Sequence, residues 1–279
     1  MTGSAQRFYV ANMVLPLLFA LAVFVLFDLT SVDVWISNWL YDPASHTFLM
    51  QKDLLFENIT HRWARIIPDW TGEAAIIGML LSFIAPLLTK IHHHGLNRLL
   101  QRTRLARAMT FCGEHRRDFI YVVVSFALTT MFIHYFKSHT NVYCPIETTL
   151  YGGVQAKTDW FSNFQLFHEA GKGRCWPGGH ASGGFTLLAL YFVALRYRWR
   201  YARVLLVCTL LLGMIYGSTR VLQGWHFMSH TLWAGIIVWF CALLTALLFY
   251  GRAALQSPAP AKTLPTPTLA LPAVQTVNK

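Results

Sequence analysis

Six long blocks of apolar residues constrain this chain more than any other feature of its sequence. They cover residues 8–27, 74–88, 119–136, 183–197, 202–216 and 232–250. A helix needs about 20 apolar residues to cross a bilayer, so the three shorter blocks are expected to draw semi-polar flanks into the interface. With 55% hydrophobic and 13% charged residues, the sequence predicts an all-α, polytopic membrane helical bundle. We expect six crossings, with five as the alternative.

The whole apolar part is expected to form one membrane domain, residues 1–255, with a motif-bearing core at about 75–250. The first block could instead be a signal peptide, but only Arg7 precedes it and no A-x-A-like cleavage site follows it. We therefore interpret it as a helix. Residues 256–279 contain five prolines and few large apolar side chains, a composition that predicts a disordered cytoplasmic tail.

Basic residues gather in two of the connections between blocks. The connection 89–118 carries seven of them, and the short connection 196–203 carries four arginines. Both are predicted to be cytoplasmic, because short cytoplasmic loops carry an excess of Lys and Arg. Most carboxylates fall on the opposite side. The net charge of +11 is therefore explained by membrane topology, and nucleic acid is not an expected partner.

A histidine triplet, His92 to His94, lies in the basic connection. Histidine is a common metal ligand, but no cysteine or carboxylate is spaced here as a partner ligand. We interpret the triplet as a solvated interfacial patch, and the sequence predicts no metal site and no cofactor.

Three segments with ionisable residues are predicted to meet the aqueous face opposite the basic connections. Lys137 ends the third block, RCWPGGHASGG (174–184) opens the fourth, and STRVLQGWHFMSH (218–230) joins the fifth to the sixth. Ionisable groups at the ends of spans usually extend to water and have no further role. Here cations, histidines and a glycine turn from separate segments fall in one layer, which indicates an outward-facing functional site.

This layer is suited to bind a phosphate. A helix that begins near Gly178 would point unpaired N–H groups outward, and the small size of Gly178 and Gly179 would let an oxyanion approach the backbone. Arg220 can contact phosphate oxygens in a bidentate manner, and Lys137 adds a second cation. A histidine beside such a pocket can attack phosphorus or give a proton to a leaving alkoxide.

These residues resemble the motifs of the type 2 phosphatidic acid phosphatases, which are integral-membrane lipid phosphatases related to bacterial acid phosphatases and vanadium haloperoxidases. The motifs of that family are a lysine, six residues and Arg-Pro; Pro-Ser-Gly-His; and Ser-Arg, five residues, His, three residues and Asp. The corresponding residues here are Lys137 and Pro145, the PGGH of 177–180, and Arg220, His226 and His230. Their order and inner spacings agree with the family.

The resemblance implies a lipid phosphatase that needs no metal. His226 would attack phosphorus and form a phosphohistidine, and His180 would protonate the leaving lipid oxygen and later activate water. Lys137, Arg220 and the backbone of the glycine turn would hold the phosphate oxygens as their charge redistributes.

Three positions depart from the family pattern. Cys144 stands where the family has an arginine, and Arg174 is the candidate replacement as a phosphate ligand, with a merely interfacial arginine as the alternative. Gly178 replaces the serine of the second motif. His230 replaces the aspartate that would orient the nucleophile.

The change at position 230 bears most directly on activity. A neutral His230 can accept a hydrogen bond from His226, but it supplies no negative charge. Either His230 orients the nucleophile with reduced power, so that activity falls at acid pH, or Asp159 or Glu169 takes over. A catalytically weak or inactive relative is the third alternative.

The five cysteines divide by their expected side of the membrane. Cys112, Cys208 and Cys241 fall in the cytoplasmic connection or within apolar blocks, where thiols stay reduced. Cys144 and Cys175 both face the oxidising side, and we expect a disulfide between them, with two free thiols as the alternative. Cα atoms more than about 7 Å apart would exclude that bond.

The expected partners are the bilayer and a phosphorylated membrane lipid at the outer boundary of a bacterial-type inner membrane, with the site facing the periplasm. The aromatic residues expected beside the site are Trp160, Trp176, Trp225 and Phe227. They do not identify the lipid, so phosphatidic acid, phosphatidylglycerophosphate, undecaprenyl pyrophosphate and lipid A phosphates all remain open. A phosphotransferase with the same intermediate is equally compatible.

Proteins of other classes are the alternatives to this enzyme. Twelve histidines among six helices could belong to a haem-binding electron-transfer protein with axial histidines from facing helices. However, His180, His226 and His230 lie at helix ends beside cations and glycines, which disfavours haem ligation. A transporter or a structural membrane protein would release no phosphate from a lipid.

Overall fold

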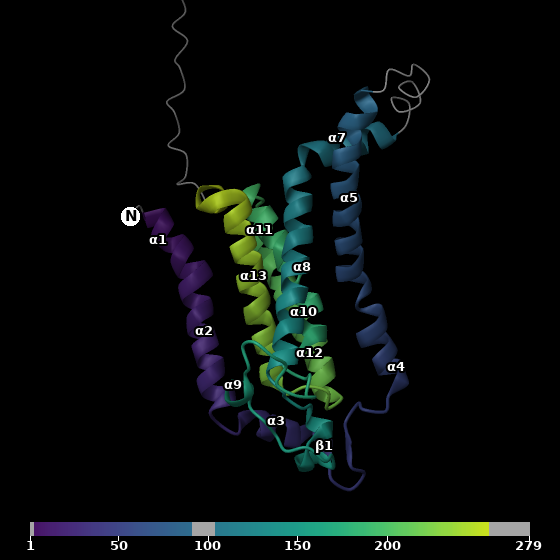
Figure 1. Ribbon diagram of the computed structural model, residues 1–279, viewed down its shortest axis with the longest axis vertical. Coiled ribbons are helices and arrows are strands. Elements are labelled where there is room, and N and C mark those ends of the chain that lie inside the picture. The colour runs from purple at the N-terminus through teal and green to yellow at the C-terminus, as the bar shows by residue number, and fades with distance from the viewer. Residues whose placement is uncertain (1–2, 91–103, 257–279) are drawn as a thin grey trace, which may run out of the picture.

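The computed structural model describes residues 3–90 and 104–256 of the chain (Figure 1). The histidine triplet at 92–94 and all of the predicted tail except residue 256 lie outside these residues. Helices make up most of the described structure, in agreement with the predicted all-α membrane bundle.

The N-terminal part consists of two long helical segments and a short hairpin. The first helical segment contains α1 (Gly3–Tyr9), the π-helical η1 (Val10–Val14), α2 (Leu15–Val23) and the π-helical η2 (Phe24–Asp28). It leads into α3 (Val32–Leu40) and the antiparallel strands β1 (Tyr41–Asp42) and β2 (Thr47–Phe48). The second contains α4 (Leu54–Glu57), η3 (Asn58–Trp63) and α5 (Ile66–Lys90).

The remaining helices, apart from α7 (Arg104–Glu114) at the upper end beside α5, form the centre of the bundle between the two N-terminal segments (Figure 1). The central helices are α8 (Arg116–His139), α10 (Gly179–Phe185), α11 (Leu188–Arg196), α12 (Ala202–Leu222) and α13 (Met228–Leu255). The connection between α8 and α10 contains the short helices η4 (Pro145–Glu147), η5 (Thr149–Tyr151) and α9 (Trp160–Asn163). This connection and α3 lie at the lower end of the molecule in Figure 1.

Five helical segments of the described chain are long and apolar enough to cross a membrane. They are Ala5–Asp28, Leu54–Ile84, Arg116–His139, Ala202–Leu222 and Met228–Leu255. These agree with five of the six predicted blocks, although the second begins twenty residues before the predicted start because α4 and η3 precede α5. The protein is therefore a multi-pass membrane protein.

The fourth predicted block is not one continuous helix, because α10 and α11 are separated by a turn at Thr186 and Leu187. Ser182 and Thr186 donate hydrogen bonds from their hydroxyls to carbonyls three residues earlier, which competes with regular helical bonding. Leu188 and Phe192 of α11 are fully buried in the main apolar core. These two short helices thus fill the interior of the bundle.

A small residue allows α10 to pack tightly against α12. A side chain at Gly184 would place its Cβ 2.9 Å from the Cα of Gly213, so only glycine permits this approach of the two backbones. Close backbone contact through small residues is how helices associate in a bilayer, where burial of apolar surface from water contributes little. The packing fixes the start of α10 relative to the end of α12.

Candidate active site

The residues of the three sequence motifs gather at one end of the bundle, the lower end in Figure 1. Lys137 lies in the last turn of α8, and Arg220 lies in the last turn of α12. His180 lies in the first turn of α10, His226 just before α13 and His230 in the first turn of α13. Helices α8 and α12 end where α10 and α13 begin, so all five residues belong to one layer.

His226 is buried next to His230. The two Nδ1 atoms lie 3.3 Å apart, so one ring donates a hydrogen bond and the other accepts it. Burial, and after it the positive charge of Lys137, lowers the pKa of His226 well below its ordinary value. His226 is therefore neutral. If its proton is on Nδ1 and directed at His230, the lone pair of Nε2 is available as a nucleophile.

The glycine turn has a different role from the one predicted for Gly178. The amide of Gly178 donates to the carbonyl of His230 at 2.9 Å, so it ties α10 to α13 and does not point at an anion. Gly179 lies against Lys137: a Cβ there would lie 3.1 Å from Cε of Lys137. The missing side chain therefore lets the Lys137 stem lie against the start of α10.

His180 is held between two aromatic neighbours. Its ring stacks on Tyr216 with centroids 5.0 Å apart and lies 4.6 Å from the ring of His61. Its Nε2 lies 2.9 Å from the carbonyl oxygen of Thr60. A carbonyl only accepts hydrogen bonds, so Nε2 carries the proton and Nδ1 of the neutral ring is left to act as a base.

A disulfide joins Cys144 to Cys175, with their Cα atoms 5.2 Å apart. It links the first motif to the second, as the sequence predicts. The Sγ of Cys175 lies 3.2 Å from Nδ1 of His226, so the bridge forms part of the wall around the nucleophile. Cys112, Cys208 and Cys241 are free thiols.

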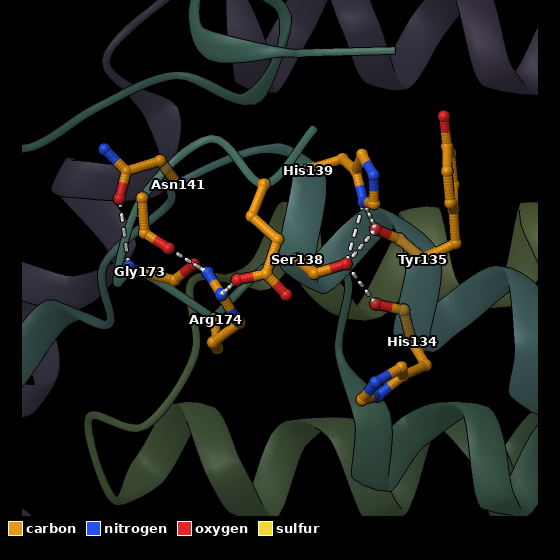
Figure 2. A network of polar contacts seen from close by, with 9 residues as sticks. His134, Tyr135, Ser138, His139, Asn141, Gly173 and Arg174 are labelled. Atoms are coloured by element: carbon orange, nitrogen blue, oxygen red, sulfur yellow. Dashed lines mark hydrogen bonds and ion pairs between the residues drawn. The ribbon is translucent and has the colours of Figure 1, made fainter. Parts of the chain in front are cut away.

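The side chain of Arg174, predicted to replace the missing phosphate-binding arginine, is engaged by other partners in this structure. Its guanidinium forms an ion pair with Glu169 at 2.8 Å and donates to the carbonyls of Gly171 and Gly173 (Figure 2). These contacts hold it on the outside of the loop. The backbone contributes instead, because the carbonyl of Arg174 accepts from Nζ of Lys137 at 2.7 Å.

Arg220 contacts a carboxylate that sequence reasoning missed. Its Nη1 lies 3.0 Å from Glu57 and 2.9 Å from the side-chain oxygen of Gln223. Glu57 also accepts from Gln223 at 2.8 Å and pairs with His61 at 2.9 Å. The motif predicts that Arg220 binds phosphate. In this structure the carboxylate of Glu57 binds Arg220 instead.

A cavity of about 420 Å³ opens beside Lys137 and His180, between α5, α8, α10 and α12, and His226 and Arg220 are not among its lining residues. Lys137, His180, His61 and Arg65 line its polar part. Its other lining residues include Phe126, Thr129, Thr130 and Ile133, from the membrane-crossing part of α8. The cavity therefore connects the polar layer with the apolar interior of the bundle. Trp176 and Phe227, expected beside the site, are buried at 2% exposure each, whereas Trp225 is 38% exposed.

Neither carboxylate proposed from sequence as a partner of the nucleophile touches His226. Glu169 is bound to Arg174 on the exterior, which removes it from consideration. Asp159 pairs with Lys157 at 2.7 Å and borders a small cavity shared with His230. Asp33 of α3 borders the same cavity and was not predicted, because nothing in the sequence links α3 to the motifs.

Comparison with known families identifies the family of the segment that carries these residues. Residues 118–254 match the family model of the PAP2 superfamily. This segment belongs to the PAP2 superfamily. No curated protein and no solved structure matches the chain significantly.

The PAP2 match includes all three motifs, from Lys137 to His230. PAP2 proteins are phosphatases, so membership supports an enzyme with phosphatase or phosphotransferase activity. The PAP2 segment begins after α3, α4 and η3. The contacts of Asp33, Glu57 and His61 with the site therefore come from outside the matched region. The polar residues of NITHRWAR (58–65), a few residues before the predicted block 74–88, were the available sequence signal for His61 and Arg65.

Proposed function

We propose that the protein hydrolyses a phosphomonoester or diphosphate of a membrane lipid through a phosphohistidine on His226, without a metal ion. The observation that carries this proposal is the environment of His226. A neutral imidazole lies in the same layer as two cationic side chains, Lys137 and Arg220, inside a PAP2 segment. Such a group can attack phosphorus while the cations stabilise the charge on the equatorial oxygens.

In the first step, Nε2 of His226 attacks phosphorus. The N–P bond forms as the P–O bond to the lipid breaks. The nearby phosphate dianion favours the protonated form of His180, which gives its proton to the departing oxygen. In the second step, His180 takes a proton from water, the water oxygen attacks phosphorus, and the N–P bond breaks. Inorganic phosphate leaves and His226 is restored.

The cavity supports a lipid as the substrate. Its polar part is lined by Lys137 and His180, and its walls continue along the membrane-crossing part of α8. A phosphate group can lie among the cations while the attached chain stays between helices. A soluble phosphate ester would use only the polar part.

The charge distribution and the disulfide support a site on the outer face of the membrane. The arginines of 196–203 follow α11 at the end opposite the site, and cytoplasmic loops are enriched in Lys and Arg. The disulfide Cys144–Cys175 lies on the site's side, where an oxidising compartment would preserve it. In a bacterial-type inner membrane this face is the periplasm.

The test is phosphate release from a panel of phosphorylated lipids in detergent, with and without a chelator of divalent metals. The wild-type protein is compared with His226→Ala and with His168→Ala, whose residue is exposed in the connection on the same side. We expect release that survives the chelator, disappears in His226→Ala and is unchanged in His168→Ala. Activity retained in His226→Ala would refute the proposal. Release that requires an added lipid acceptor would make the protein a phosphotransferase instead.

A further inference from the structure

His230 stands where the third motif expects a negatively charged residue, so the chain must stabilise His226 in another way if it is an active phosphatase. When Nε2 of His226 attacks phosphorus, positive charge develops on the ring, and its Nδ1–H donates more strongly. Nδ1 of His230, 3.3 Å away, is the nitrogen placed to receive this hydrogen bond, beside the Cys175 sulfur at 3.2 Å. A neutral imidazole accepts there with its proton on the opposite nitrogen, and it supplies no charge of its own.

A carboxylate lies close to His230 on another element. Asp33 is in the first turn of α3 and is buried at 5% exposure. One of its oxygens accepts from the amide of Ser229 at 2.9 Å. Ser229 is the neighbour of His230 in the first turn of α13. The position of the Asp33 carboxylate relative to His230 is therefore fixed by a backbone contact.

Asp33 and His230 also border one cavity of about 10 Å³. This volume suits a single water molecule. The other charged groups around it are Asp28 at the end of η2, and Lys157 and Asp159 in the connection before α9. The positive charge of Lys137 of α8 also acts on His230. The surroundings of His230 thus combine two cations with three carboxylates.

The three carboxylates differ in the groups to which they bond. Asp159 is paired with Lys157 at 2.7 Å, and its side chain is 40% exposed, so its charge is largely compensated and screened. Asp28 accepts from the indole of Trp233 at 2.8 Å, one turn further along α13. Among the described residues, only the carboxylate of Asp33 both borders the His230 cavity and bonds to the residue adjacent to His230.

We propose that Asp33 is a positioning residue for catalysis, whose charge acts on the nucleophile His226 through His230. The proposal rests on the phosphohistidine mechanism above. Ionised Asp33 stabilises the polarised pair of imidazoles across the cavity, either directly or through one water molecule. The pair and Asp33 together perform the task of the motif's aspartate, and Asp33 reaches the site from outside the PAP2 segment.

The pH dependence of the rate follows from the burial of Asp33. Burial raises the pKa of Asp33 to about 6, with hydrogen bonds from Ser229 opposing the shift. The carboxyl is protonated below this pH and ionised above it, so kcat should rise with pH through about 6. His226 does not titrate there, because its own pKa is well below the ordinary value.

The decisive variant is Asp33→Asn, which keeps an oxygen to accept from Ser229 and removes the charge. We expect kcat to fall by on the order of tenfold to a hundredfold, with KM within about twofold of wild type and the rise near pH 6 lost. Asp159→Asn serves as the comparison and should lose much less. A larger loss in Asp159→Asn than in Asp33→Asn would overturn the proposal.

A second background separates a role through His230 from a purely structural one. In His230→Asp the charge lies next to His226, so adding Asp33→Asn should no longer reduce kcat. An equal loss in both backgrounds would show that Asp33 only supports the fold of α13. If His230→Asp does not fold, the pH profile of Asp33→Asn decides: a retained rise near pH 6 overturns the proposal. If His226→Ala releases phosphate at the wild-type rate, the proposed function itself is rejected.

Discussion

At the scale of single residues, the site combines one neutral imidazole with cations that are already engaged by neighbours. His226 is kept neutral by burial and by Lys137. Lys137 bonds to the carbonyl of Arg174, and Arg220 bonds to Glu57. Each cation is thus oriented by an acceptor that an incoming phosphate can join or replace.

The first prediction concerns the geometry of Arg220. Arg220→Lys keeps the positive charge but loses the planar fork that binds two phosphate oxygens at once. We expect kcat/KM for the lipid substrate to fall by on the order of tenfold to a hundredfold. Arg252→Lys, at an exposed position near the opposite end of the bundle, is the matched control. Equal activity of the two variants would mean that Arg220 acts only as a point charge or not at all.

At the scale of elements, the site is bordered by the start of the second membrane-crossing segment and by the connection between α8 and α10. The segment α4–η3 contributes Glu57, which contacts Arg220, and His61 and the carbonyl of Thr60, which contact His180. The connection between α8 and α10 closes the same end through the disulfide. Movement of either segment would change which side chains contact a bound phosphate.

The second prediction follows from the contact between Glu57 and Arg220. A phosphate that binds Arg220 must displace this carboxylate or approach it against like charge. Glu57→Gln should therefore lower the inhibition constant of inorganic phosphate by about fivefold to tenfold. Glu73→Gln, an exposed change further along the same helical segment, should leave it unchanged. A higher inhibition constant in Glu57→Gln would identify Glu57 as a support for Arg220 rather than a competitor.

The third prediction concerns the disulfide, which joins residues 31 positions apart. Closing a loop of this length restricts the unfolded chain and stabilises the folded state by roughly 2–4 kcal/mol. The double variant Cys144→Ser, Cys175→Ser should melt at a lower temperature in detergent. Dithiothreitol should lower the melting temperature of the wild-type protein in the same way and leave the variant unaffected. Identical melting of all four samples would show that the bridge adds no stability.

At the scale of the whole molecule, the sequence predicted what depends on composition and spacing along the chain. Apolar blocks specify helices in a bilayer because no other open structure satisfies the backbone there. The third motif placed His226 and His230 in one site, and the structure brings their Nδ1 atoms to 3.3 Å, with His226 just before α13 and His230 in its first turn. Contacts made by residues outside the motifs were beyond such patterns. The direction of Arg174 depends on Glu169 and loop carbonyls, and the approach of Asp33 depends on how α3 folds beneath α13.

The fourth prediction tests the orientation of the molecule in the membrane. Phe167 is 90% exposed in the connection on the side of the site, and Trp199 is 51% exposed in the arginine-rich connection. Single cysteines at these positions, in a Cys208→Ser background, are treated with a membrane-impermeant maleimide on intact cells. We expect Phe167→Cys to be labelled and Trp199→Cys to be protected until the membrane is opened. The reverse pattern would place the site in the cytoplasm.

The most direct measurement of the central claim is isolation of the phosphorylated enzyme. The protein is mixed with a lipid carrying labelled phosphate, denatured at alkaline pH to preserve a phosphoramidate, and mapped by peptide mass spectrometry. The account predicts one phosphate on His226, absent from His226→Ala and lost on treatment with acid. A phosphate on another residue, or turnover by His226→Ala at the wild-type rate, would contradict it.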